Sequence, residues 1–377
     1  MSGTISICSL LSDRRHVGRT RFQSFEAPSE PAEGEVLLST DSFALTSSNI
    51  AYASCGESLR YWDFFPTRCA GWGHMPVWGF ATVYRSNVPG IDVGERFYGL
   101  FPIANFVHLK PGRVGVHGFH DLSAHRQGLP SPYNQYTRCV VESGQSQEQE
   151  DTQMLLRPLF FTSYMLADFL RNNDFFGATQ VVMSSAANTA AFGTAFCLEN
   201  AINRPNLVGL TSRRSHEHVV QLGLYDQVVS YDRTSQLQAP GSTLYLDFAG
   251  EALLRLEQDC LLAGQGVRDC STPRPANTNA NEPSNGSGPV ALGGTVPGVL
   301  QLGWAAGLMS QRFETALREF CAELAGSGDG WITVRPGYGF EGAARVVRSL
   351  HVAGEQPHVG HVIRLNKRPW SVCTRLA

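Results

Sequence analysis

Residues 176–247 constrain the fold more than any other part of the chain. They contain two short, uncharged apolar runs, at 181–183 and 207–210, with a helical pattern of small and apolar residues between them. Strands without charge that alternate with helices are typical of a parallel sheet covered on both faces. This stretch therefore predicts a βαβ unit within an α/β fold.

The turn after the first predicted strand is a candidate phosphate site. A dinucleotide-binding βαβ unit carries G-x-G-x-x-G here, because glycines let the backbone approach the phosphates. This chain has SSAANTAA at 184–191, with no glycine before Gly193. Small residues still permit a close approach, and free N–H groups at a helix start bind anions. The candidate ligands are Ser184, Ser185, Asn188 and Thr189. A helix start made of small residues, without any ligand, explains the sequence of this segment equally well.

The end of the second predicted strand indicates which dinucleotide the unit prefers. An NAD-binding unit has an acidic residue there for the ribose hydroxyls. This chain instead has Ser212, Arg213 and Arg214. Two guanidinium groups favour a 2′-phosphate, with which arginine pairs in a fork. We therefore expect NADP as the cofactor; the alternative is a helix start with two surface arginines.

Composition places the chain among globular proteins with two domains. Its 377 residues exceed what a single core usually supports. A net charge of −3 gives no support for binding nucleic acid or an anionic membrane. The nine cysteines lack C-x-x-C spacing, which predicts free thiols and a cytoplasmic location. No stretch is apolar enough to predict a membrane span.

The order of motifs along the chain resembles a known superfamily. GEVL at 34–37 and VGERFYG at 93–99 precede the βαβ unit, in a β-rich segment punctuated by Gly and Pro. This order is similar to the medium-chain dehydrogenase/reductase, or quinone-oxidoreductase-like, superfamily. RYWDFFP at 60–66 and PVWGF at 76–80 further resemble a branch catalogued as a domain of unknown function.

The resemblance implies two domains. Residues 1–150 with 331–377 would form a GroES-like β-rich catalytic domain, and residues 151–330 a Rossmann-like domain with a doubly wound parallel sheet. The low-complexity residues 268–288 predict a flexible insertion in the second domain. Zinc-binding relatives have Gly-His-Glu where this chain has WGF at 78–80, so we expect no metal.

The same resemblance indicates residues for chemistry. The segment around Tyr61 lines the cleft in the parent superfamily, where a phenol is a candidate proton donor that Asp63 would orient. The candidate catalytic residues are Tyr61, Asp63, Tyr52 and Asn49. The candidate substrate-binding residues are Trp62, Phe65, His120, Tyr133 and Asn134. An aromatic loop that packs on its own domain is the alternative.

These features imply a zinc-independent, NADPH-dependent oxidoreductase. Its substrate would be an enone or carbonyl of a small apolar molecule, for example one from secondary metabolism. The alternative is a non-redox enzyme on the same fold, a lyase, isomerase or hydrolase, whose glycine-poor cofactor site has degenerated. A non-catalytic binding protein is a third hypothesis, because a fold alone does not identify a function. The sequence leaves open whether the chain forms a homodimer.

Overall fold

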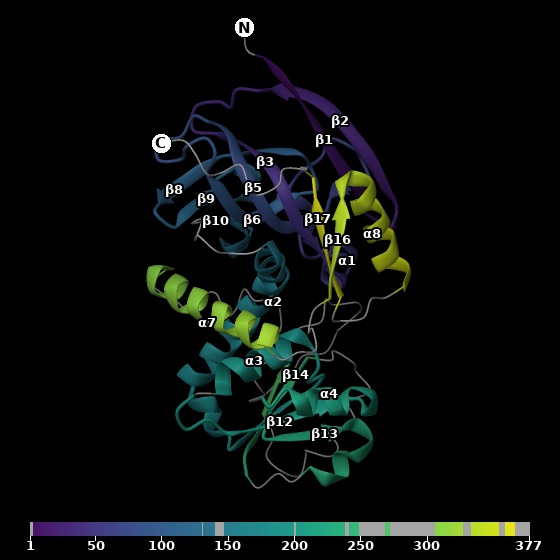
Figure 1. Ribbon diagram of the computed structural model, residues 1–377, viewed down its shortest axis with the longest axis vertical. Coiled ribbons are helices and arrows are strands. Elements are labelled where there is room, and N and C mark those ends of the chain that lie inside the picture. The colour runs from purple at the N-terminus through teal and green to yellow at the C-terminus, as the bar shows by residue number, and fades with distance from the viewer. Residues whose placement is uncertain are drawn as a thin grey trace, which may run out of the picture. The chain divides into compact units, whose positions relative to one another are not determined.

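The chain divides into two compact units (Figure 1). A computed structural model describes residues 3–129, 131–139, 147–199, 201–237, 241–248, 268–271, 306–326, 333–353 and 359–365. Unit 1 comprises Met1–Leu155 and Gly328–Ala377, and unit 2 comprises Leu156–Ser327. Both terminal segments of the chain therefore belong to unit 1. None of the described helices is long and apolar enough to span a membrane.

Unit 1 contains a large, mainly antiparallel sheet. Its strands lie in the order β16-β17-β3-β5-β6-β10-β9-β8, and β7 pairs with β3. Their bounds are β3 Val36–Leu45, β5 Pro76–Ser86, β6 Arg96–Pro102, β7 Phe106–Leu109, β8 Pro111–Gly115, β9 Gly118–Asp121, β10 Gln135–Arg138, β16 Thr333–Tyr338 and β17 Val359–Arg364. Only β16 and β17 pair in parallel among these strands. Because β17 pairs with β3, the two ends of the chain share one sheet.

A smaller sheet and short helices complete unit 1. The sheet has the order β2-β1-β4, with bounds Thr20–Pro28, Thr4–Asp13 and Trp72–His74. The helices are α1 Ser47–Ser54, η1 Tyr61–Phe64, η2 Ala124–Arg126, η3 Ser131–Asn134 and α8 Gly339–Ala353. Helix α8 lies beside β16 and β17 in Figure 1.

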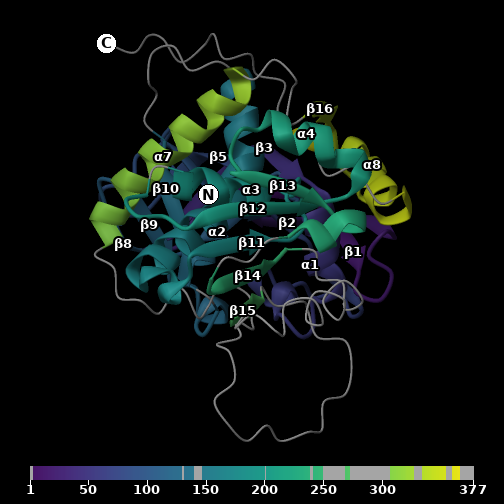
Figure 2. The ribbon, with the colours of Figure 1, turned by 90° about the horizontal axis from the view of Figure 1, so that it is seen from below.

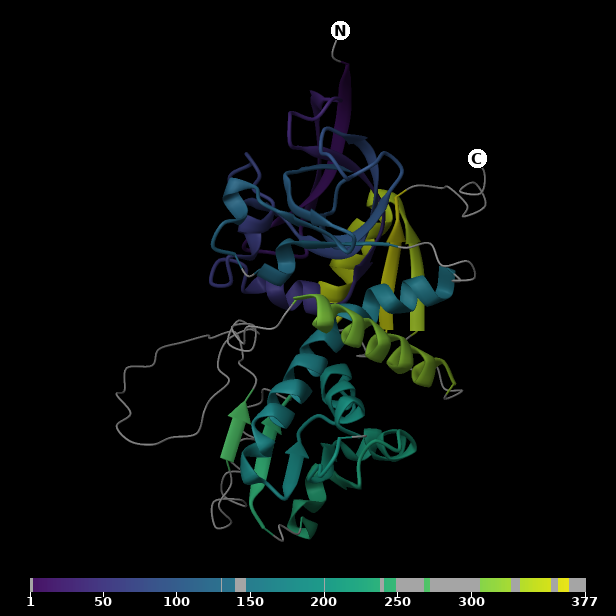
Figure 3. The same cartoon turned by 90° about the vertical axis from the view of Figure 1, so that its left-hand side faces the viewer.

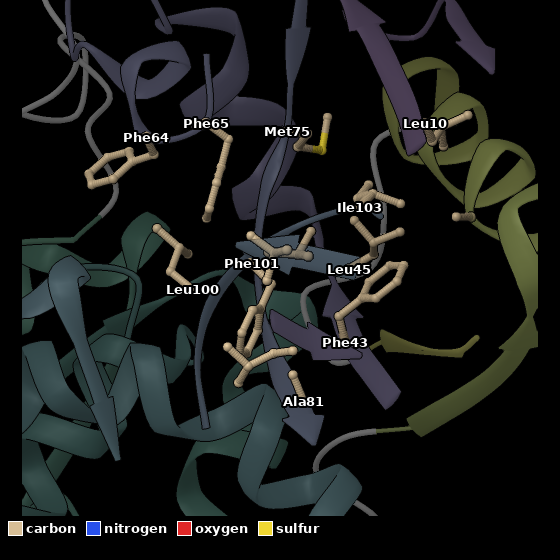
Figure 4. Packing of buried hydrophobic residues seen from close by; sticks show 14 of the residues in the cluster. Leu10, Phe43, Leu45, Phe64, Phe65, Met75, Ala81, Leu100, Phe101 and Ile103 are labelled. Carbon is tan, nitrogen blue, oxygen red and sulfur yellow. The ribbon is translucent and has the colours of Figure 1, made fainter. Parts of the chain in front are cut away.

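The core of unit 1 brings these elements together. Phe43 and Leu45 of β3 are fully buried, as is Phe101 of β6. Figure 4 shows them in one cluster with Phe64 and Phe65, which come from η1 and the residue after it. Full burial of one such side chain contributes about 1.5–3 kcal/mol, so this cluster holds η1 on the sheet.

His74 of β4 makes the stability of unit 1 depend on pH. Its Nδ1 is buried without a partner among the described residues. Burial lowers the pKa of His74 from 6.5 to about 4, because a charged ring loses its hydration. Between these values the unfolded chain binds the proton and the folded chain does not, so stability falls as the pH falls through this window.

We therefore expect the His74→Gln variant to have a flatter stability profile. Its melting temperature should fall less than that of the wild type between about pH 6.5 and pH 4, since Gln takes up no proton. Thermal unfolding across this range measures the difference. Parallel curves for the two proteins would show that His74 titrates normally in the folded state.

Unit 2 is built on a parallel sheet with the order β13-β12-β11-β14-β15 (Figure 2). The strands are β11 Gln180–Met183, β12 Asn206–Thr211, β13 Gln227–Ser230, β14 Thr243–Asp247 and β15 Arg268–Ser271. All four residues of β11 are buried, as expected for a strand covered on both faces. The chain runs from β11 outward to β13 and then returns to β14 on the other side of β11. Such a reversal is where ligands bind in open α/β sheets.

Unit 2 also contains helices. They are α2 Gln147–Asn172, whose first turns belong to unit 1, α3 Thr189–Glu199, α4 His216–Gln221 and α7 Ala306–Gly326. Phe160 of α2 stacks on Phe320 of α7 at 4.5 Å between ring centroids and contacts Phe196 of α3 at 6.2 Å. This aromatic contact holds α3, and the turn before it, in place.

The predicted insertion at 268–288 begins too early. Arg268–Ser271 form β15, which pairs in parallel with β14 (Figure 3). The composition of the segment did not indicate this strand. A short edge strand is stabilised by pairing with its partner strand more than by the propensity of its own residues. Residues 272–288 lie outside the described residues.

Candidate functional site

The turn between β11 and α3 is held by hydrogen bonds to distant residues. Ser184 is fully buried, and its hydroxyl donates to Asp247 Oδ1 at 2.9 Å and accepts from the Phe248 N–H at 2.7 Å. Ser184, a predicted phosphate ligand, therefore joins the end of β11 to the end of β14. Its hydroxyl therefore has a structural role, because both of its hydrogen bonds are made within the protein.

Ser185 and Asn188 are also engaged within the protein. Ser185 has a φ of 50°, in the left-handed region that favours glycine. Its N–H donates to the Tyr231 hydroxyl at 2.7 Å. Asn188 Oδ1 accepts from the Ala190 N–H at 2.8 Å, so the side chain caps α3. One donor of the turn, the Ser185 N–H, and one acceptor, Asn188 Oδ1, thus have partners within the protein.

Several donors of the turn remain available to an anion. The N–H groups of Ala187, Thr189 and Ala191 have no acceptor among the described residues. The hydroxyls of Ser185 and Thr189 likewise have no described partner. Unpaired N–H groups at a helix N-terminus attract negative charge. The residues present therefore fit a phosphate group, with fewer donors than the sequence suggested.

The end of β12 presents the predicted arginines. Ser212 accepts from the Ser215 N–H at 3.2 Å and so caps η5 (Arg213–Ser215). Arg213 and Arg214 are exposed, and neither forms an ion pair with a described carboxylate. A hydrogen bond from Ser230, and to a lesser extent the charge of Arg213, lower the pKa of Asp232. Arg213 thus has an acidic neighbour, whereas Arg214 has none in the described part of the chain.

In unit 1, Tyr61 and Asn49 meet at one backbone oxygen. The Tyr61 hydroxyl donates to the Pro76 carbonyl at 2.8 Å, and Asn49 Nδ2 donates to the same oxygen at 3.2 Å. Tyr61 is 8% exposed, and burial raises its pKa. Asp63 pairs with Arg60 at 3.0 Å and makes no described contact with Tyr61. The predicted pair of Tyr61 and Asp63 is therefore absent, and the Tyr61 proton is already shared.

Two other phenols are better placed to donate a proton. Tyr52 of α1 is 38% exposed and stacks on Tyr61 at 5.8 Å between centroids. Tyr133 packs against Phe64 at 5.3 Å and Trp78 at 5.9 Å. Neither hydroxyl has a hydrogen-bond partner among the described residues. Burial raises the pKa of both groups, and Tyr52 adds to the effect on Tyr133. Both phenols therefore keep their protons at neutral pH.

A buried arginine fixes the segment that carries Tyr133. The side chain of Arg126 is fully buried with Asp121, at 3.1 Å between Nε and Oδ2. Arg126 Nη1 donates to the Tyr133 carbonyl at 3.0 Å and to Asn134 Oδ1 at 3.2 Å. Its guanidinium also lies 4.4 Å from the ring centroid of Phe65. Arg126 thus connects the residue after η1 to η3. Asn134, a predicted substrate contact, accepts a hydrogen bond from Arg126.

The remaining predicted substrate contacts are mostly structural. Trp62 is 1% exposed and lies between two glycines; a Cβ atom on Gly56 or Gly73 would come within 2.1 Å or 2.3 Å of its ring. Phe65 is 7% exposed, in the same core. Both side chains therefore belong to the buried core of unit 1. His120 lies on β9, which pairs with β10, and no described contact joins it to the phenols.

The sequence analysis did not identify Tyr231 as the partner of the Ser185 N–H. It also did not identify the contacts of Arg126 with Asp121, Tyr133 and Asn134. A phenol directly after a parallel strand was the available signal for Tyr231, because such strand ends meet at the ligand edge of the sheet. Among the described residues, no three His, Cys, Asp or Glu side chains gather to hold a metal ion. The expectation that no zinc binds stays a prediction.

Comparison with known proteins identifies the family. The family model described as Protein of unknown function (DUF2855) matches residues 43–354. The chain belongs to this family. No curated protein matches its sequence. The predicted resemblance to a branch catalogued as a domain of unknown function is confirmed by this match.

Solved structures confirm the predicted α/β fold class with GroES-like and Rossmann-like parts. CurA from Vibrio vulnificus, in complex with NADPH, has a TM-score of 0.55 at 11% identity, covering 96% of this chain and 100% of that one. S. aureus TarJ, in complex with NADPH, has a TM-score of 0.55 at 7% identity, with coverages of 96% and 99%. The quinone oxidoreductase from Coxiella burnetii has a TM-score of 0.50 at 14% identity, with coverages of 96% and 100%.

Proposed function

We propose that this DUF2855 member is a zinc-independent, NADPH-dependent reductase of an enone or carbonyl on a small apolar molecule. The observation that carries the proposal is the end of β12, where Arg213 and Arg214 are exposed without an ion-pair partner in the described chain. Two exposed guanidinium groups at this edge suit a 2′-phosphate. The NADPH complexes of CurA and TarJ, which share the fold, support the same cofactor.

The residues of unit 2 would bind the cofactor through its phosphates. The N–H groups of Ala187 and Thr189, at the start of α3, would hold the pyrophosphate. Arg213 and Arg214 would pair with the 2′-phosphate. NADPH, when bound, supplies the hydride.

The residues of unit 1 would supply the proton. We assign this role to Tyr52, because its hydroxyl is partly exposed and has no acceptor in the described chain. A raised pKa keeps the phenol protonated, so that it donates to an oxygen that becomes negative during reduction. Tyr61 stacks on Tyr52, and the partly exposed rings of Tyr133 and Trp78, which pack against each other, would offer apolar surface to a small substrate.

One observation favours the alternative of a non-redox enzyme with a degenerate cofactor site. The hydroxyl of Ser184 and the N–H of Ser185 both have partners within the protein. A phosphate turn with fewer free donors binds a dinucleotide more weakly.

Replacing both arginines tests the proposed cofactor. We expect Arg213→Ala/Arg214→Ala to weaken NADPH binding at least tenfold and NADH binding hardly at all, because only NADPH carries the 2′-phosphate. A charge-assisted hydrogen bond contributes roughly 1.5–3 kcal/mol, and tenfold corresponds to about 1.4 kcal/mol. Isothermal titration calorimetry with both nucleotides measures the effect.

The matched control is Arg318→Ala, which removes an exposed arginine on α7 and should change neither affinity. An equal loss for NADPH and NADH would show that Arg213 and Arg214 do not read the phosphate. If the wild type binds neither nucleotide, the non-redox function becomes the better hypothesis.

A further inference from the structure

The phosphate turn has an internal partner in Tyr231. This residue follows β13 directly and begins η6 (Tyr231–Gln236), and the sheet order places β12 between β13 and β11. The side chain therefore reaches past the end of β12 to the turn after β11. There its hydroxyl accepts from the Ser185 N–H at 2.7 Å. The ring packs on the buried cluster of Val182, Val208, Leu210, Val229 and Tyr245.

The bonded N–H is one more donor that an anion at this turn would otherwise bind, beside those of Ala187, Thr189 and Ala191. Ser185 follows the last buried residue after β11 and turns the chain with its left-handed φ of 50°. The next N–H, of Ala186, is directed inward to the Leu210 carbonyl at 2.8 Å. At the first turn of a βαβ unit the backbone N–H groups approach the pyrophosphate. The Tyr231 oxygen thus accepts the hydrogen bond that a phosphate oxygen would accept.

We propose that Tyr231 is an affinity-determining residue of the cofactor site, whose hydroxyl occupies the Ser185 N–H and must leave it before a pyrophosphate group binds there. The inference rests on the proposed function, because it concerns the same turn. It predicts that nucleotide affinity is reduced by a hydrogen bond within the protein. A bound phosphate gains the Ser185 N–H only when the Tyr231 bond is broken.

The Tyr231→Phe variant tests this inference. Phenylalanine keeps the ring on its apolar cluster and removes the hydroxyl that accepts from the Ser185 N–H. We expect NADPH and inorganic pyrophosphate to bind roughly threefold to tenfold more tightly than to the wild type, the range of one neutral hydrogen bond. Calorimetry measures both ligands. In the ligand-free protein, the Ser185 amide should also exchange its hydrogen with solvent faster.

Tyr225→Phe is the matched control. The Tyr225 hydroxyl donates to the Ala186 carbonyl at 3.1 Å, so this variant also loses one phenol bond to the turn. It frees a carbonyl and no N–H, and an anion gains nothing from a carbonyl. We expect no tightening for either ligand. Melting curves of both variants verify that each protein folds.

The outcomes separate this inference from the proposed function. If the wild type binds NADPH and Tyr231→Phe binds it equally or more weakly, the inference is wrong and the proposed function stands. If only Tyr231→Phe binds NADPH or pyrophosphate, the inference stands and the wild-type cofactor function fails. If neither protein binds either ligand, or if Tyr225→Phe tightens binding as much, the inference is overturned.

Discussion

The Tyr52→Phe variant should reduce an enone with NADPH about 10²- to 10⁴-fold more slowly than the wild type, the range that a general acid contributes. The loss should appear in kcat, because the phenol acts on charge that develops during reaction. The binding of NADPH should stay unchanged, since the proposed phosphate ligands all lie in unit 2. Steady-state kinetics with a small enone and calorimetry with NADPH measure the two effects.

Tyr61→Phe and Tyr133→Phe are the controls for this experiment. Tyr61 shares its proton with the Pro76 carbonyl, so its loss should lower kcat far less than the loss of Tyr52. Tyr133 keeps a hydroxyl without a described partner and is the competing donor. A large loss of kcat in Tyr133→Phe with a small one in Tyr52→Phe would transfer the role to Tyr133. Comparable activity in all three variants would contradict proton donation by a phenol.

Arg126→Met should destabilise unit 1 by about 3–5 kcal/mol, the cost of leaving one partner of a buried ion pair alone. Asp121 is 2% exposed, and its Oδ1 atom already accepts from the Ser123 hydroxyl at 2.6 Å and the Lys110 N–H at 3.1 Å. Without Arg126 the buried carboxylate loses the opposite charge that stabilises it. Methionine retains most of the side-chain volume, so the effect reports charge and hydrogen bonds. Urea unfolding followed by tryptophan fluorescence measures the loss.

Two further variants make the Arg126 result interpretable. Arg138 pairs with Glu95, but both side chains are about a quarter exposed (20% and 26%), so Arg138→Met should cost no more than about 1 kcal/mol. Adding Asp121→Asn to Arg126→Met should restore part of the stability, because it removes the unpaired charge. Equal costs for Arg126→Met and Arg138→Met would show that the buried pair contributes little.

The pattern of residues along the chain was enough to identify the architecture. The uncharged runs at 181–183 and 207–210 predicted buried parallel strands, and β11 and β12 are those strands. Such strands can be inferred in this way because a strand covered on both faces has no position for a charged side chain, which leaves an uncharged apolar run in the sequence. The motifs at 60–66 and 76–80 likewise indicated a branch of unknown function, and the DUF2855 model covers both of them.

The availability of each polar group depended on contacts made across the fold. Ser185 and Ser184 looked alike in sequence, yet their partners, Tyr231 and Asp247, lie 46 and 63 residues away. Tyr61 looked like the better donor than Tyr52 until folding placed the Pro76 carbonyl, 15 residues on, against its hydroxyl. A hydroxyl has one proton to donate, and which acceptor receives it depends on positions that only folding brings together.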